Sequence, residues 1–431
     1  MLNPGTTRGP ASSLDDLRYS RQLLASIDGR GLDQAKISAG RVALIGAGTL
    51  GSNYAEGAAA TGVGSIDIFD FDTVGPETRG RSIAFVPDDD GRPKAVALAD
   101  RVRQLNPDVE ARGIVANALL LGGATWEAYD VLVLATDNVL TRLNLSSLAL
   151  QLPRGPQAVL EAGLAGFDWS VQVMGPGTHC YRCSFLDSAA VNVSRSCNGV
   201  ALDVGGAVLP TTLPAAFSAV GIMIQETLLA LSGSAPVFLG REVRASMTTA
   251  ELSVLRINPR PSCKDHIKWR EEDVFRLPFE PTHSVGQIRE HCARELRLPV
   301  RDLTLAAPHR LLKTVTCFAC GATVDARGYV DGYVASVCRE CGEVVGSVNT
   351  CRCGAPAPPP PLRPFQRLKC PACGQLDPNG FDIEASTILQ DDDVTVERSG
   401  IPAGEVLGIY AGDIKAHLIL EGGSWTEHSW G

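Results

Sequence analysis

Short apolar runs alternate with glycine-rich or polar turns through the first part of the chain. One run covers residues 41–45 and ends in a glycine turn, another leads into the acidic segment 68–74, and a third covers 131–134. A longer apolar stretch, about 215–231, predicts a helix. Apolar strands alternating with helices are typical of a parallel sheet buried on both faces, so we predict a Rossmann-like α/β fold here.

The turn after the first run carries three glycines, Gly46, Gly48 and Gly51, and the next strand ends near Asp70 and Asp72. Glycines at such a turn let the backbone approach phosphate, and the following helix N-terminus favours negative charge. An acidic residue at the end of the second strand meets ribose hydroxyls. Taken alone, this motif predicts an NAD site.

Charged residues around the glycines favour a different nucleotide. The segments 18–22, 79–81, 93–94 and 135–138 contribute Arg21, Arg81, Lys94, Asp137 and Asn138. Together they resemble the ThiF/MoeB family of ubiquitin-activating-enzyme-like adenylyltransferases over residues of about 14 to 268.

The resemblance implies ATP and Mg²⁺ as cofactors. Joining a carboxylate to the α-phosphate of ATP brings anions together, so the site needs cations for the phosphates and a carboxylate for magnesium. By resemblance, Asp70 binds the ribose, Arg81 and Lys94 contact the phosphates, and Asp137 holds magnesium. Asp72 either meets the ribose hydroxyls as well or caps the following turn.

Other positions in the same motifs have less direct roles. By resemblance, Arg21 reaches into the partner subunit of a homodimer as an arginine finger, whereas Asn138 and Arg142 receive weaker roles. Thr78 and Ser82 depart from the asparagine and glutamine usual in the family, which weakens or replaces one ATP contact.

Composition favours an enzyme with a large core. The chain has 431 residues, 45% hydrophobic and 20% charged, with a formal net charge of −9. That negative charge argues against general nucleic-acid binding. The sequence has no eighteen consecutive apolar residues, so it predicts no membrane-spanning helix. The N-terminus lacks signal-peptide features, so we expect a cytoplasmic protein.

Thirteen cysteines in such a protein indicate metal ligands before disulfides. Cys180 and Cys183 form a CxxC, and Cys263 and His266 form a CxxH farther along. In the resembled family two such pairs meet, so we predict a Cys₃His zinc site. The alternative is an exposed His266 and an incomplete site.

Cys197 follows the first pair and matches a family cysteine that in some members receives the activated carboxylate and in others is dispensable. A covalent role needs an exposed thiol with a lowered pKa. Otherwise Cys197 is a partly buried loop thiol. Gln225 and Glu226 resemble a family pair that is structural or related to the dimer rather than catalytic.

Beyond residue 268 the resemblance ends. Residues 273–279 predict a strand, His283 begins a helix in which Cys292 lies on the apolar face, and 302–305 predict another strand. Four more short strands are expected at 387–390, 394–397, 405–410 and 417–420. This order looks like part of a β-grasp, the fold with which eukaryotic members recruit a conjugating enzyme.

Cysteine pairs interrupt that second region. The predicted ligands of two zinc ribbons are Cys317, Cys320, Cys338, Cys341, Cys351, Cys353, Cys370 and Cys373. The spacing of the first four is typical of a ribbon, but the pairing between the sets stays open, and a redox CxxC is the alternative. The predicted organisation is a tail over 1–17, an adenylation domain over 18–268, a mostly β domain over 270–316 and 383–423, inserted ribbons over 317–375 and a tail over 424–431.

The predicted reaction is ATP-dependent adenylation of the C-terminal carboxylate of a ubiquitin-like or sulfur-carrier protein ending in Gly-Gly, with onward transfer to a thiol or a conjugating enzyme. Three alternatives are adenylation of a ribosomal peptide, a non-catalytic subunit of a heterodimer and an NAD oxidoreductase. A double glycine that ends at Gly423 resembles a carrier tail, although a flexible turn is the simpler interpretation.

Overall fold

The computed structural model describes residues 18–27, 30–184, 210–278, 280, 282–317, 323–325, 336–337, 344–345, 381–390, 392–399, 401–412 and 414–421. Several predicted features lie outside the described residues: Cys197, Cys320, Cys338, Cys341, Cys351, Cys353, Cys370, Cys373 and Gly423, together with the side chain of Cys317.

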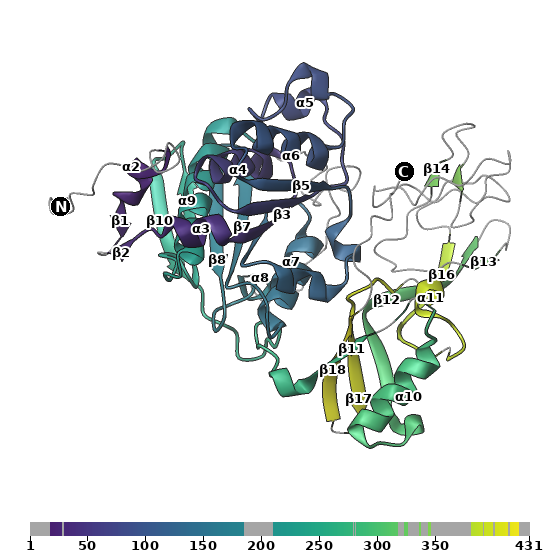
Figure 1. Cartoon of the computed structure of the whole chain (residues 1–431). Coiled ribbons are helices and arrows are strands. Elements are labelled where there is room, and N and C mark those ends of the chain that lie inside the picture. The colour runs from purple at the N-terminus through teal and green to yellow at the C-terminus, as the bar shows by residue number, and fades with distance from the viewer. Residues whose placement is uncertain are drawn as a thin grey trace.

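An eight-stranded sheet forms the larger part of the molecule (Figure 1). Its strands are β3 Arg41–Ile45, β4 Ser65–Phe69, β5 Glu110–Ile114, β6 Val131–Leu134, β7 Ala158–Ala165, β8 Asp168–Met174, β9 Arg241–Ser246 and β10 Glu251–Arg256. The order is β10-β9-β8-β7-β6-β3-β4-β5, parallel from β5 to β7 and antiparallel from β7 to β10. The predicted α/β class is confirmed.

Helices cover both faces of this sheet. The main ones are α3 Gln34–Ala39, α4 Thr49–Ala60, α6 Lys94–Leu105, α7 Val139–Gln151 and α9 Leu213–Leu231. Along β3, Val42 and Leu44 belong to one apolar cluster with α4, α6 and α9, whereas Ala43 and Ile45 belong to a second with α7. Burial on both faces explains why these strands are continuously apolar.

Short elements connect these layers. They are α2 Ser20–Leu23, β1 Ser26–Ile27, β2 Arg30–Gly31, α5 Pro76–Arg79, α8 Tyr181–Ser184, and the 3₁₀ turns η1 Pro87–Asp89, η2 Ala118–Leu120, η3 Gly123–Ala128, η4 Glu271–Asp273 and η5 Val300–Asp302.

Helix α9 is long and apolar enough to cross a membrane by length and composition alone. Its residues Ala215, Ala219 and Met223 are fully buried in the cluster shared with α4 and the sheet. The packing therefore makes α9 a core helix of this domain.

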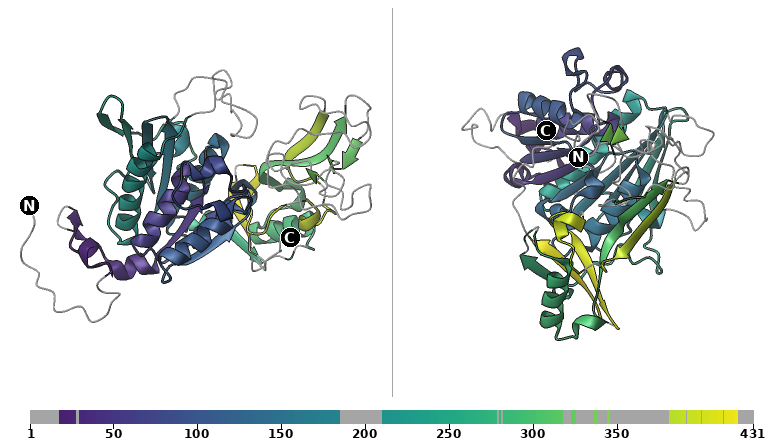
Figure 2. Two further views of the ribbon diagram at one scale, coloured as in Figure 1. Left: turned by 90° about the horizontal axis from the view of Figure 1, so that it is seen from above. Right: turned by 90° about the vertical axis from the view of Figure 1, so that its right-hand side faces the viewer.

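A smaller sheet lies beside the large one, as the two views of Figure 2 show. It contains β11 Val274–Pro278, β12 Thr304–Cys317, β13 Thr323–Asp325, β16 Phe381–Ile388, β17 Val406–Ala411 and β18 Ile414–Glu421; β14 Ser336–Val337 and β15 Val344–Val345 pair separately. Its first and last strands, β11 and β18, are parallel, and the others pair antiparallel. The β-grasp assignment itself stays a prediction.

Helix α10, Val285–Leu296, packs with this sheet and matches the sequence pattern. Ser284 accepts a hydrogen bond from the Gln287 amide, and the Gln287 side chain accepts one from the Ser284 amide, so the helix begins with a capping box. Cys292 is 3% exposed within the apolar cluster of this domain, which confirms it as a core residue.

The strand predicted at 394–397 is wrong. Residues Val396–Ser399 form a short helix, α11, in which Val396 is buried. The Thr395 hydroxyl accepts a hydrogen bond from the Arg398 amide, and the Thr395 carbonyl accepts one from Ser399. This local capping outweighs the strand preference of two β-branched valines in so short a segment.

The two sheets share a close interface. The Ala124 amide donates to the Gly404 carbonyl over 2.8 Å, and the rings of Trp269 and His417 stack with centroids 3.7 Å apart. Arg276 of β11 forms an ion pair with Glu127 of η3 over 2.9 Å. Because these contacts include backbone, aromatic and charged groups, they hold the smaller domain against η3.

Candidate active site and cysteine–histidine cluster

The candidate nucleotide site lies where the strand order reverses. β3 has β4 on one side and β6 on the other, and the three parallel strands end at the same edge. Gly46, directly after β3, has a φ of +98°. A Cβ at Gly46 would lie 2.7 Å from the carbonyl oxygen of Ala135, so the loops after β3 and β6 touch. Such a reversal point is where open α/β sheets bind ligands.

Gly48 and Gly51 have different roles in this loop. A Cβ at Gly51 would lie 1.8 Å from the Gly46 carbonyl oxygen, so only glycine fits inside the turn. A Cβ at Gly48 would meet nothing within 4 Å, and Gly48 is the N-cap of α4. Gly51 therefore shapes the turn, whereas Gly48 leaves the helix N-terminus open to a phosphate.

Asp70, directly after β4, is held under the glycine loop. Its carboxylate accepts hydrogen bonds from the Ala47 amide over 2.6 Å and the Asp72 amide over 2.7 Å. Burial raises the pKa of Asp70 to about 6, and the charge of Lys94 opposes that rise. The carboxylate is thus fixed beside the backbone that would receive a nucleotide.

Lys94 and Asp72 form an ion pair that their separate motifs do not reveal. Lys94 begins α6, and its Nζ lies 3.2 Å from the Asp72 carboxylate, with only 14% of the lysine side chain exposed. Its amide also donates to the Asp72 carbonyl over 2.8 Å. Asp72 therefore positions the lysine.

Arg81 is positioned by hydrogen bonds with Glu77, Thr211 and Asn53. Its guanidinium donates to the Glu77 carbonyl over 3.1 Å and to the Thr211 hydroxyl over 2.8 Å. The Asn53 side chain of α4 donates to the Arg81 carbonyl over 3.3 Å.

The two positions that depart from the family pattern, Thr78 and Ser82, are both buried beside Arg81. The Ser82 hydroxyl accepts a hydrogen bond from the Ala84 amide over 3.1 Å. Ser82 thus stabilises the local turn with its hydroxyl, and Thr78 takes part through its carbonyl, which accepts a hydrogen bond from the Arg81 amide over 3.1 Å.

The loop after β6 carries the candidate magnesium ligand. Asp137 is exposed, and the next residue, Asn138, is the N-cap of α7 and accepts a hydrogen bond from the Thr141 amide over 3.1 Å. Asn138 therefore acts as a helix cap. Magnesium in ATP sites binds one or two carboxylates together with phosphate oxygens, and the accessible Asp137 fits that chemistry.

Arg142 lies below this loop in a nearly buried network. Its side chain is 13% exposed and forms an ion pair with Glu161, 2% exposed, over 2.7 Å. Burial alone would lower the pKa of Arg142, but the Glu161 carboxylate raises it above its usual value. Arg142 also donates to the Tyr181 hydroxyl over 3.3 Å and to the Thr136 carbonyl over 2.7 Å.

A groove of about 470 Å³ follows the four strands from β7 to β10. Its polar lining includes Asp168, Ser170, Glu242, Arg244, Glu251 and Ser253. Gly163 lies in the lining, and a Cβ there would be 3.7 Å from an Arg142 guanidinium nitrogen. The turn at one end contains Gly166, which bridges to Thr211, the partner of Arg81. The groove therefore adjoins both arginines.

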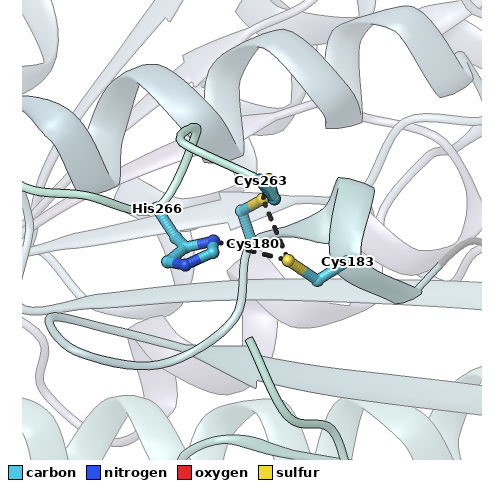
Figure 3. A group of neighbouring side chains, drawn as sticks. All are labelled: Cys180, Cys183, Cys263 and His266. Carbon is cyan, nitrogen blue, oxygen red and sulfur yellow. Dashed lines mark hydrogen bonds between the residues drawn. The ribbon is translucent and has the colours of Figure 1, made fainter. Parts of the chain in front are cut away.

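Cys180, Cys183, Cys263 and His266 meet as predicted (Figure 3). Cys180 Sγ lies 3.8 Å from Cys183 Sγ and 3.7 Å from Cys263 Sγ, and Cys183 Sγ lies 3.4 Å from His266 Nδ1. Zinc–sulfur bonds of about 2.3 Å at tetrahedral angles place two sulfurs about 3.8 Å apart. The four side chains fit a zinc ion, which would link α8 to the segment before the second domain.

Other predicted residues lie away from this edge. Arg21 is exposed on α2, and its role across a dimer stays a prediction. Glu226 is fully buried in α9, accepting hydrogen bonds from the Phe238 amide over 2.7 Å and from Gln225 over 3.1 Å. These bonds support a structural role for the Gln225–Glu226 pair.

Sequence reasoning missed Asn53, Glu161 and Tyr181. Asn53 occupies an apolar helix, and Glu161 interrupts an apolar strand, so each is a polar residue in a pattern that predicts burial. Buried polar residues need partners, and that is the signal that could have found these two. Tyr181 lies inside the CxxC, whose spacing indicates only the two thiols as functional groups.

The sequence of this chain is similar to those of known proteins. The E. coli (strain K12) "Sulfur carrier protein ThiS adenylyltransferase" is 35% identical over 182 residues, which are 40% of this chain and 69% of that protein. The Caenorhabditis briggsae "Adenylyltransferase and sulfurtransferase MOCS3" is 33% identical over 195 residues, 43% of this chain and 46% of that protein. The chain is therefore an ATP-dependent adenylyltransferase by class, rather than an NAD oxidoreductase.

The ThiF family model matches residues 19–265, and the chain belongs to the ThiF family. A solved structure of E. coli MccB superposes with a TM-score of 0.50 at 19% identity, covering 59% of this chain and 73% of MccB. That likeness concerns the fold.

Proposed function

We propose that the chain uses Mg-ATP to adenylate the C-terminal carboxylate of a ubiquitin-like or sulfur-carrier protein ending in Gly-Gly, with release of pyrophosphate. The single observation that carries the proposal is the meeting of the loops after β3, β4 and β6 at one edge, next to a groove. The edge suits a nucleotide, and the groove suits an extended peptide tail.

The proposed roles follow from the charges. The carboxylate of Asp70 accepts hydrogen bonds from the ribose hydroxyls, while Lys94 and Arg81 offset the phosphate charge as the substrate carboxylate attacks the α-phosphorus. Asp137 would hold magnesium, which when bound would offset the negative charge that develops on the departing pyrophosphate. The new bond joins a carboxylate oxygen to phosphorus, and the bond to the bridging oxygen of pyrophosphate breaks.

Three finer assignments belong to the proposal. Zinc fills the cysteine–histidine cluster, Arg21 completes the site of a second copy in a homodimer, and the adenylate passes to a thiol such as Cys197 or to a partner protein. The carrier as substrate class is suggested by the E. coli relative, whose name specifies the carrier ThiS.

ATP–pyrophosphate exchange tests the proposal. Wild type, Asp137→Ala and Asp108→Ala are assayed with candidate carriers ending in Gly-Gly and with short peptides. Asp108 is an exposed aspartate before β5, at the opposite end of the strand from Ile114, so it is a matched control.

We expect exchange that needs one carrier, disappears in Asp137→Ala and persists in Asp108→Ala. Exchange supported by a peptide and by no carrier would replace the substrate class with a ribosomal peptide. Absence of exchange with every candidate would overturn the adenylation proposal.

A further inference from the structure

We infer that Arg142 is a positioning residue that fixes the loop Thr136–Asn138 and couples it mechanically to the cysteine–histidine cluster. The inference rests on the proposed role of Asp137 in magnesium binding. Arg142 itself is 13% exposed and lies under the loop, so it acts through the backbone next to Asp137.

The first link joins Arg142 to the loop. Its Nε donates to the Thr136 carbonyl over 2.7 Å, one residue before Asp137. On the other side of Asp137, Asn138 caps α7, and Arg142 belongs to the first turn of the same helix. The candidate magnesium ligand therefore lies between two anchored residues, which restricts the directions its carboxylate can take.

The second link joins Arg142 to the sheet and to the cluster. Its Nη1 lies 2.7 Å from the Glu161 carboxylate in β7 and 3.3 Å from the Tyr181 hydroxyl. The guanidinium carbon also lies 5.9 Å from the centre of the Tyr181 ring. A planar guanidinium with five donors can hold three partners in one geometry, which the single ammonium of a lysine reproduces poorly.

Tyr181 is part of the cluster because it lies between Cys180 and Cys183. The same region is fixed to α7 farther along the helix: the Tyr181 amide donates to the Ser146 hydroxyl over 3.4 Å, and the Trp269 amide donates to the Gln151 carbonyl over 2.8 Å. A metal that orders the cluster thus orders α7 from its middle to its end. The hydrogen bonds from Arg142 to Tyr181 and to Thr136 extend this ordering to the loop that precedes α7.

A purely structural role of Arg142 would have a different effect on the magnesium dependence of the enzyme. If the arginine only stabilised the core, its replacement would lower the free energy of unfolding without changing the magnesium dependence of the folded enzyme. If it positions the loop, the concentration of Mg²⁺ that half-saturates exchange rises, while the rate at saturating Mg²⁺ changes little.

The test uses two conservative variants and one control of the full chain. Arg142→Lys keeps the charge opposite Glu161 but loses the forked geometry, and Tyr181→Phe removes only the hydroxyl. Arg154→Lys is the control, because Arg154 follows the other end of α7 and pairs with Glu271 at the surface, where its side chain is 62% exposed.

We expect half-saturating Mg²⁺ to rise about tenfold in Arg142→Lys and about threefold in Tyr181→Phe, as the loss of hydrogen bonds to a charged group implies. Arg154→Lys should match wild type.

Metal content and thermal unfolding are measured in parallel. In wild type, chelation of the cluster metal should also raise the amide hydrogen-exchange rates of residues 135–142.

The inference is overturned if wild type shows normal pyrophosphate exchange and neither Arg142→Lys nor Tyr181→Phe changes its Mg²⁺ dependence. That outcome would leave the proposed function intact. If wild type shows no exchange, the proposed function fails, and calorimetric titration of Mg²⁺ and ATP into the same variants decides the inference. Absence of magnesium-dependent binding in wild type would then overturn it.

Discussion

The nucleotide edge and the cysteine–histidine cluster contact the same helix, α7, but differ in how they are held. The edge consists of glycine turns and of charges that reach solvent, with Asp137 exposed. In the cluster, Cys180 and Cys183 are buried and all four ligand atoms lie within 4.8 Å of one another. The groups proposed to receive a substrate are accessible, whereas two of the four cluster residues are buried.

The largest difference should appear on removing a cluster ligand. Cys263→Ser or chelation should lower the free energy of unfolding by about 4 kcal/mol or more, because a structural metal site contributes folding energy directly. Urea unfolding with and without a chelator measures this. Cys292→Ala is the control, since Cys292 is buried in the other domain and this variant keeps all four cluster ligands. Chelation should therefore destabilise Cys292→Ala as it does wild type, whereas Cys263→Ser, which has lost a ligand, should respond little. An equal chelator response in both variants would contradict the assignment.

Substitutions at two glycines of the candidate nucleotide site should have different effects, one on stability and the other on ATP binding. Gly51→Ala should cost about 3 kcal/mol of stability, because its Cβ would clash with the Gly46 carbonyl oxygen. Gly48→Ala should cost about 1 kcal/mol or less, yet weaken ATP binding, because its Cβ would enter the open space at the helix N-terminus. Thermal unfolding and ATP titration of both variants check this, and equal stability losses would refute the division.

The half-buried carboxylate of Asp70 should make stability depend on pH. Burial raises the pKa of Asp70 to about 6, opposed by Lys94, against about 3.9 in an unfolded chain. The folded state therefore binds this proton more tightly, and the resulting stabilisation, complete below about pH 4, is lost as the pH rises through about 6.

Relative to Asp70→Asn, which does not titrate, wild type should lose about 2 kcal/mol of stability between about pH 4.5 and about pH 7.5. Denaturant unfolding at the two pH values measures the difference. A difference that does not change with pH would show that burial leaves this carboxylate unperturbed.

The smallest stability effect belongs to the most exposed group of the edge. Asp137→Asn should change the free energy of unfolding by less than about 0.5 kcal/mol while abolishing pyrophosphate exchange, because an exposed carboxylate contributes little to the fold. Unfolding and exchange measured on one preparation test both halves. A loss of stability in Asp137→Asn as large as that expected for Cys263→Ser would contradict the proposed difference between the two sites.

Sequence patterns predicted the parts of this molecule that local chemistry determines. The strands 41–45 and 131–134 appear at those residues as β3 and β6, and the CxxC and CxxH pairs meet. The segment 394–397 was predicted wrongly, since Thr395 forms only an isolated antiparallel bridge with Ser284 and the chain continues as a helix from the next residue. At Val396 the polar caps from Thr395 determined a short helix instead.

By itself the sequence determined the α/β class, the glycine turn, the acidic strand ends and the separate CxxC and CxxH pairs, because periodicity and spacing act over a few residues. That the two pairs meet was implied by the family resemblance. Only the tertiary structure decided that Lys94 pairs with Asp72, that the apolar α9 is a core helix, and that Arg142 joins Thr136, Glu161 and Tyr181. The ion pairs and hydrogen bonds of Lys94 and Arg142 join residues up to 39 positions apart, and the Tyr54–Thr227 hydrogen bond between α4 and α9 joins residues 173 apart. No local pattern encodes which buried polar group meets which partner.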